Sequence, residues 1–111
     1  MWRIQRVNQL IKEELSKILL RGLDISEEVL VTVTRVETST DLRHSKVFFS
    51  VLPREQTKEI QQILNYKIYD FQHQLNKRLK MRIVPKVKFI EEKKIAQAER
   101  IEEILEKINK K

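Results

Sequence analysis

The 111-residue chain contains no cysteine and a single glycine, Gly22. Without cysteine, disulfides, thiol catalysis and cysteine-based zinc sites are excluded. A single glycine also excludes the glycine-rich loops that hold phosphates in P-loop and dinucleotide-binding proteins. No run approaches the roughly 18 apolar residues of a membrane span, and no apolar signal-peptide segment follows the first basic residues. We therefore expect a cytoplasmic protein that does not span a membrane.

Residues that could form a catalytic or metal site are few and scattered. The histidines, His44 and His73, lack a second histidine at helical spacing, so we expect no metal site. Adjacent carboxylates on a helix point about 100° apart and do not converge on a substrate. We expect such pairs on solvated faces, for example Glu13-Glu14, Glu91-Glu92 and Glu102-Glu103. The sequence predicts neither an enzyme nor a cofactor.

The chain is rich in charged residues, and positive charge predominates. Charged residues make up 35% of the sequence, hydrophobic residues 41%, and the net charge is +7, with a pI near 9.8. The length suits one domain over residues 1–111 and is too short for two. A small basic domain attracts polyanions, so nucleic acid is the first candidate partner and an anionic membrane surface the second.

The periodicity of apolar residues predicts an α+β fold in the order α-β-β-α-β-α. Gly22 stands where a helix C-cap is expected, and Pro85 marks the start of the last strand. We expect a three-stranded sheet covered on one face by helices, the order of a type II KH domain through the third strand. The core spans about 3–91, with helices at 3–21 and 56–80 and strands at 29–37, 45–52 and 83–90, and a C-terminal helix follows at about 95–109.

Alternation along the strands predicts which side chains point to the core. In the second strand Val47 and its alternate neighbours point inward, and Phe48 points the other way. There Phe48 either stacks a nucleic-acid base or packs against the final helix. In the first strand Val33 and Val36 do not fall on one face by strict alternation. Either a bulge intervenes or Val36 packs on the far side.

Basic residues gather between positions 77 and 88, where no acidic residue occurs. Near a helix C-terminus, cations also complement the helix dipole. This effect explains Lys77, Arg78 and Lys80 without a bound ligand. The others are better explained by contacts with a phosphate backbone. We predict that RNA binds mainly through Lys77, Arg78, Lys80, Arg82, Lys86 and Lys88, with Arg43, Lys46 and Lys67 as secondary contacts.

Several short segments, taken in order, resemble the ribosome-binding factor A family over nearly the whole chain. They begin with Arg6-Val7 and Ile11–Leu19 in the first helix. The hairpin follows with 31–34, 36–39, 41–42 and 46–50, and the third strand is entered through Leu79, 81–85, Val87 and Phe89. Arg100-Ile101 and Leu105 match the closing helix.

The resemblance implies a KH type II-like fold without the GxxG loop of ordinary KH domains. Family members break the long helix at an Ala-x-Gly kink, where this chain has Lys67-Ile68-Tyr69. The helix here either bends less or bends by other means. Near the C-terminus Glu92, Lys94 and Ala98 replace the family's aspartate, serine and glycine, which favours a more helical segment.

The function that the resemblance implies is that of a non-enzymatic assembly factor. Such a factor binds the immature 30S small subunit through 16S rRNA, supports late rRNA processing and maturation, and is linked to growth in the cold. A ribosome-assembly GTPase promotes its release, and we expect a monomer. The alternative is a protein-interaction adaptor, in which amphipathic helices bind partner proteins and the basic charge serves solubility.

Overall fold

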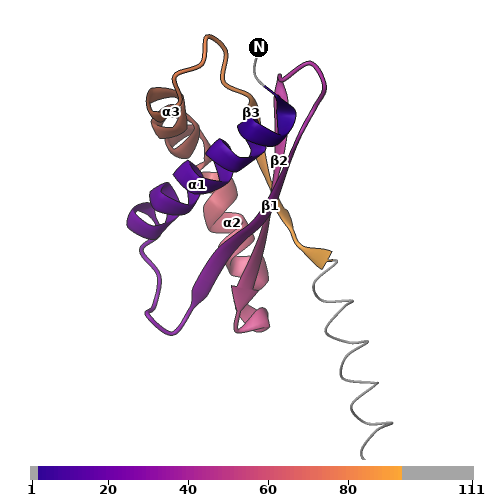
Figure 1. Ribbon diagram of the computed structural model, residues 1–111. Helices are drawn as coiled ribbons and strands as arrows, with labels where there is room; N and C mark the ends of the chain where they lie inside the picture. The colour runs from indigo at the N-terminus through magenta and orange to yellow at the C-terminus, as the bar shows by residue number, and fades with distance from the viewer. Residues whose placement is uncertain (1–2, 94–111) are drawn as a thin grey trace, which may run out of the picture.

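The computed structural model describes residues 3–93, which form an α+β domain (Figure 1). The order α-β-β-α-β holds through the third strand, and the predicted helix 95–109 lies outside the described residues. In chain order the elements are α1 (Ile4–Gly22), β1 (Leu30–Thr38), β2 (His44–Leu52), the 3-10 turn η1 (Arg54–Gln56), α2 (Thr57–Tyr66), α3 (Ile68–Arg78) and β3 (Lys86–Glu91).

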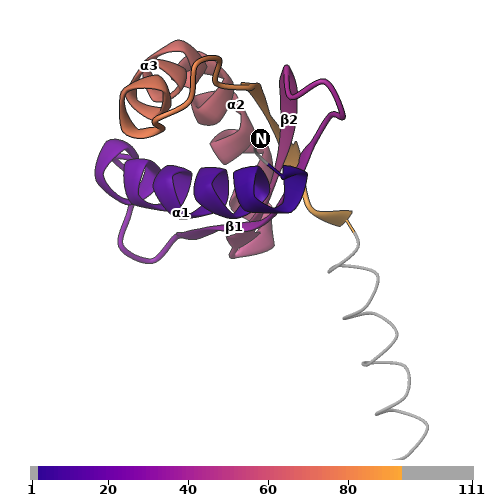
Figure 2. The same ribbon diagram turned by 45° about the horizontal axis from the view of Figure 1, so that its top comes forward.

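The three strands form one sheet in the order β1-β2-β3. The hairpin partners β1 and β2 run antiparallel, and β3 lies parallel to β2, because α2 and α3 carry the chain back across the sheet. All three helices cover the same face, as expected (Figures 1 and 2). The other side, turned away from α1, α2 and α3, is called the outer face below.

A β-bulge in β1 explains the irregular spacing of its valines. The pairing register between β1 and β2 shifts between Val33 and Arg35. The extra residue restores the inward direction, so that both Val33 and Val36 are buried in the core. Of the two alternatives that the sequence left open, the bulge is the correct one.

Gly22 provides space between α1 and α3, and it does not form the predicted C-cap. It is the last residue of α1 and has no positive φ, and the cap residue is Leu23 in an extended conformation. A Cβ at Gly22 would lie 2.7 Å from Cε1 of Phe71 on α3. Phe71 is completely buried and meets Phe89 of β3 edge-on, with ring centroids 6.4 Å apart.

The predicted helix over 56–80 is broken in two at Lys67. Its φ of −93° and ψ of 5° leave the helical region, so the break forms here without glycine. The ammonium of Lys67 donates a hydrogen bond of 2.8 Å to the carbonyl oxygen of Gly22. This bond ties the break to the end of α1 and satisfies one of the carbonyls that a helix end leaves without an intrahelical partner.

Two further expectations from the sequence are wrong. The third strand begins at Lys86 and not at 83, since Pro85 lacks the N–H that a ladder needs. Glu92 is only 5% exposed and does not lie on a solvated face. Its carboxylate accepts hydrogen bonds from Arg35 Nε at 2.6 Å and from Thr34 Oγ1 at 3.1 Å, as a buried charge requires.

Candidate nucleic-acid interface

The basic residues between 77 and 88 divide into two groups. Lys86 and Lys88 are exposed on the outer face of the sheet, alternating with the buried Val87 and Phe89. The others lie at the end of α3 and in the loop that follows it. We call them the helix-end cluster, which consists of Lys77, Arg78, Lys80 and Arg82.

The hairpin adds two side chains to the pair on β3. In the parallel register His44 is the partner of Lys86, and Lys46 is the partner of Lys88. Neighbouring strands lie about 4.8 Å apart, so these exposed side chains project from adjacent positions. We call His44, Lys46, Lys86 and Lys88 the sheet cluster. They line, with Ser45 and Val87, a shallow hollow of 410 Å³.

The positive charge of the sheet cluster is not balanced within residues 3–93. None of its three lysines forms an ion pair with the residues described there. Glu37 is the register partner of Lys46, but its carboxylate pairs with Arg35. Like charges on adjacent strands repel each other, and an anion in the hollow between them would relieve that repulsion.

Arg35 also determines what Phe48 can do on the outer face. Its guanidinium lies 3.7 Å from the centre of the Phe48 ring, a cation–π contact that occupies one side of the ring. The hydrogen bond to Glu92 raises the pKa of Arg35, with smaller contributions from the charges of Glu92 and Glu37. That side of Phe48 is therefore covered and is not available to stack a base.

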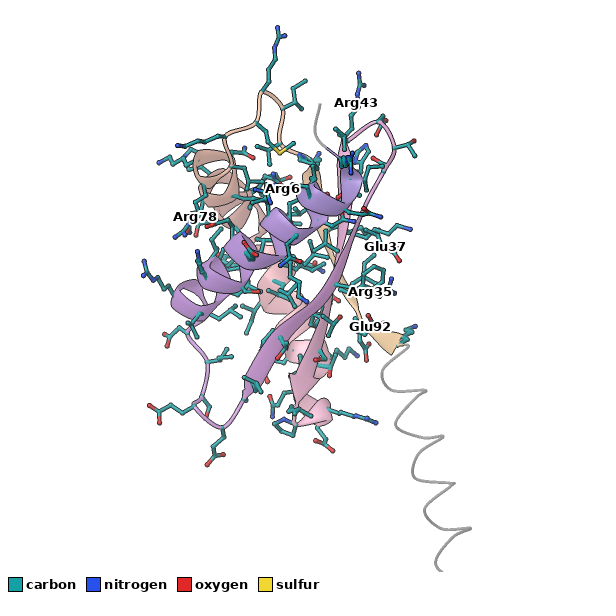
Figure 3. All side chains as sticks on the ribbon, viewed as in Figure 1. Arg6, Arg35, Glu37, Arg43, Arg78 and Glu92 are labelled. Carbon is teal, nitrogen blue, oxygen red and sulfur yellow. The ribbon has the colours of Figure 1, made fainter. Side chains whose placement is uncertain are left out.

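The loop that follows α3 lies at the same end of the molecule as the hairpin turn (Figure 1), and Arg78 lies beside α3, away from Arg43 of the hairpin (Figure 3). Arg78 Nη1 lies 3.2 Å from Oε2 of Glu14 on α1, so this cation already has a structural partner. Lys77 and Arg78 belong to the last turn of α3, where they also complement the helix dipole. Lys80 and Arg82 lie beyond the helix in the exposed loop.

The secondary candidates differ in their surroundings. Arg43 is exposed in the hairpin turn, and its carbonyl accepts a 2.8 Å hydrogen bond from the N–H of Lys86, which places it beside the sheet cluster. Lys46 belongs to that cluster. Lys67 lies apart from it, and its ammonium is engaged by Gly22. Lys67 therefore has a structural role, and its contact with RNA remains a prediction.

Two exposed tyrosines were not among the residues predicted from the sequence to bind RNA. Tyr66 and Tyr69 flank Lys67 at the helix break and are 87% and 83% exposed. His73 follows Tyr69 by four residues and Lys77 follows His73 by four, so these three share one face of α3. Exposed aromatic rings beside cations can stack unpaired bases. The sequence did hold a sign of this exposure, because neither tyrosine lies at the helical spacing of the buried apolar residues.

Neither a metal centre nor a bilayer span emerges from the described part of the chain. Within residues 3–93, no group of three or more potential ligands could hold an ion. None of the helices there is long and apolar enough to cross a membrane.

Comparison with known proteins identifies the family. The family described as ribosome-binding factor A matches residues 3–105. The chain belongs to the ribosome-binding factor A family. It is similar to the ribosome-binding factor A of Thermodesulfovibrio yellowstonii, with 38% identity over 108 residues that cover 97% of this chain and 92% of the relative.

Solved structures agree with the fold of this family. The crystal structure of ribosome-binding factor A from Thermus thermophilus superposes with a TM-score of 0.70 at 20% identity, covering 80% of this chain and 94% of that one. A homology model of the Thermus factor, fitted into a cryo-EM map of a 30S–RbfA complex, gives a TM-score of 0.66 at 20% identity, with coverage of 80% and 93%.

Family membership makes the break at Lys67 informative. The resemblance implied alanine and glycine at this position, and this chain has Lys67 and Tyr69 instead. The break nevertheless stands at the expected position. It is accompanied by a side-chain hydrogen bond from Lys67 to the carbonyl oxygen of Gly22 at the end of α1.

Proposed function

We propose that this protein is a non-enzymatic assembly factor that binds the immature 30S small subunit through 16S rRNA. In this role it supports late rRNA processing and subunit maturation in the cytoplasm. It acts as a monomer and leaves the subunit with the help of a ribosome-assembly GTPase. Membership of the ribosome-binding factor A family supports the proposal, as does the Thermus factor's placement in a 30S complex map.

The observation that carries the proposal is the sheet cluster. Its lysines lie on adjacent strands around a common hollow and lack ion pairs within the described residues. Ammonium groups at such spacing suit the oxygens of a phosphate backbone. The affinity then comes largely from the release of counterions.

The cluster favours recognition of shape and backbone over recognition of sequence. Lysine ammonium groups are point charges and lack the planar fork by which arginine recognises a base edge. The ring of Phe48 is covered on one side by Arg35. A folded rRNA surface that presents closely spaced phosphates is therefore the ligand that this face suits best.

Charge reversal on the outer face tests the proposal. We expect Lys88→Glu to weaken binding to immature small subunits. The slope of log K against log salt should fall by about 0.7 to 0.9 for each phosphate that the protein no longer neutralises. Binding is measured by co-sedimentation at several salt concentrations, and crosslinking to precursor subunits maps the rRNA positions.

Lys58→Glu on α2 is the matched control. It changes the net charge by the same amount at an exposed position away from the sheet cluster. If both variants lose affinity equally, net charge and not the cluster governs binding. Unchanged co-sedimentation of Lys88→Glu, Lys86→Glu and Arg82→Glu at every salt concentration would refute the assignment.

A further inference from the structure

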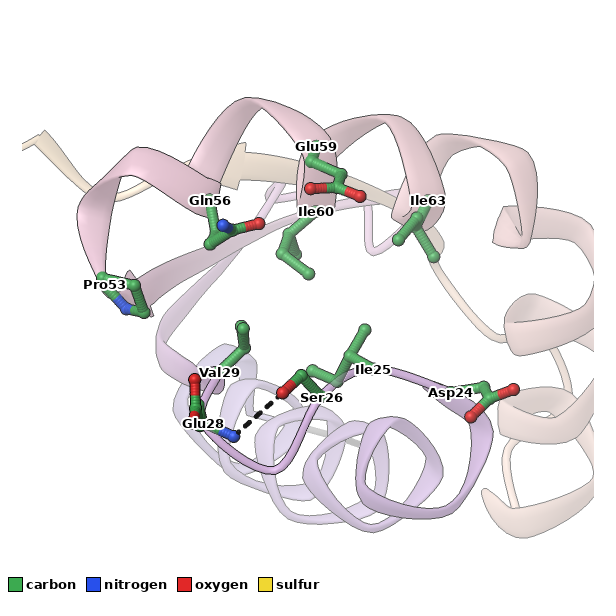
Figure 4. A pocket seen from close by; sticks show the side chains of 10 residues that line it. All are labelled: Asp24, Ile25, Ser26, Glu28, Val29, Pro53, Gln56, Glu59, Ile60 and Ile63. Carbon is green, nitrogen blue, oxygen red and sulfur yellow. Dashed lines mark hydrogen bonds between the residues drawn. The ribbon is translucent and has the colours of Figure 1, made fainter.

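The connector after α1 and the start of α2 lie at the end of the molecule opposite the hairpin turn (Figure 1), and a groove opens between them (Figure 4). It has a volume of 320 Å³ and lies between the connector that follows α1 and the segment formed by η1 and α2. Ile60 and Ile63 of α2 point toward Ile25 and Val29 of the connector (Figure 4). The floor of the groove is therefore apolar.

A second hollow continues the apolar surface on the other side of the connector. It has a volume of 350 Å³ and shares Ile25, Ser26 and Val29 with the first. Leu20 and Leu30, which line it, are 85% and 59% exposed. Large aliphatic side chains that are exposed together beside two adjoining hollows mark an interaction surface more often than isolated ones do.

The charge of this surface is opposite to that of the protein. Asp24, Glu28 and Glu59 line the groove, and Glu27 lines the second hollow. No lysine or arginine is among the described residues that line either one. These four carboxylates form no ion pairs within residues 3–93. In a chain of net charge +7, the charged side chains that line these two hollows are all acidic.

We propose that this acidic groove docks a basic amphipathic segment of a protein partner. The apolar side chains of the segment would fill the two hollows around Ile25 and Val29. Its lysines or arginines would pair with the carboxylates on the rim, which gives the complementarity that orients an interface. The surface is separate from the sheet cluster, and the inference does not depend on the proposed RNA function.

The test uses the full chain and a synthetic amphipathic helical peptide of leucine and lysine. Backbone amide chemical shifts of the labelled protein are followed as the peptide is added. We expect saturable shifts confined to residues 24–31 and 53–63. The double variant Glu28→Gln/Glu59→Gln should bind the peptide about 2-fold to 30-fold more weakly, the range for two exposed ion pairs.

The matched control is Glu13→Gln/Glu91→Gln. It removes two exposed carboxylates outside the groove and should leave the affinity unchanged. Equal weakening in both double variants would mean attraction by net charge alone and would overturn the inference. Shifts of the same residues by a single-stranded RNA, or with rising protein concentration alone, would assign the groove to RNA or to a second copy and would also overturn it.

Discussion

Replacing Gly22 by alanine tests how tightly α1 and α3 are packed. Alanine favours a helix over glycine by up to about 1 kcal/mol, and that gain is smaller at Gly22 because it is the last helical residue. Against it stands a Cβ placed 2.7 Å from Cε1 of Phe71. Such overpacking in a filled core costs about 1–3 kcal/mol. We expect Gly22→Ala to lower the free energy of unfolding by about 1 kcal/mol.

The cost persists because Phe71 cannot move aside. Its ring is completely buried and meets Phe89 edge-on. Relief would have to come from a shift of α1 away from α3, which would stretch the hydrogen bond from Lys67 to Gly22. In thermal unfolding, the loss corresponds to a fall in Tm of about 4 °C or more.

A double-mutant cycle isolates the contact. In a Phe71→Leu background the aromatic edge is gone, so adding Gly22→Ala should be neutral or stabilising. The coupling between the two positions should then exceed about 0.5 kcal/mol. A Gly22→Ala protein as stable as the parent in urea unfolding, with Phe71 in place, would show that α1 and α3 are not in close contact at this point.

The two remaining predictions concern the helix break and the hairpin turn. Replacing Tyr66 and Tyr69 by alanine should weaken binding to unpaired RNA by about 1–3 kcal/mol per stacked base and leave the salt slope unchanged; a changed slope in a filter-binding assay would contradict stacking. In the turn, the hydrogen bond from Ser39, and then the bond from the Arg43 N–H, lower the pKa of Asp41. Its stabilising effect is full above the unfolded pKa of about 3.9 and is lost as pH falls through the lower folded value. Asp41→Asn should therefore lose less stability than the parent between pH 6 and pH 3 in urea unfolding, and equal losses would contradict this.

Much of the fold could be predicted because the strands and helices repeat apolar residues at regular intervals. Val47 and Phe49 are buried and Lys88 is exposed as alternation requires. The irregular features carry no such period. The bulge before Val36 was one of two alternatives, and only the pairing register decides between them.

The features that escaped prediction depend on contacts between distant residues. Gly22 was assigned to a C-cap from its position at the helix end, but its neighbour Phe71 is 49 positions away and visible only in three dimensions. From the sequence Glu92 is one of two adjacent carboxylates, whereas in the structure it is buried and pairs with Arg35 of β1, 57 residues away. The residues adjacent in sequence to Gly22 and Glu92 do not indicate that Phe71 and Arg35 are their partners.

Only part of the candidate interface could be predicted, because some of its residues come together only through the pairing of strands. A run of cations between 77 and 88 is a local pattern, and it led to the exposed lysines on β3. The pairing that brings Lys46 beside Lys88 is a property of the sheet. It joins two segments that are far apart in the sequence and separates Lys86 and Lys88 from the helix-end cluster.

Charge is separated along the long dimension of the sheet, and this separation has a physical consequence. The sheet cluster and the exposed loop after α3 lie toward the hairpin turn, and the acidic groove lies at the opposite end (Figure 1). The field of a polyanion turns such a molecule before contact, so the basic end leads. The carboxylates around the groove are then directed away from the RNA. A protein partner could occupy the groove while the outer face is bound, because the two surfaces share no residue.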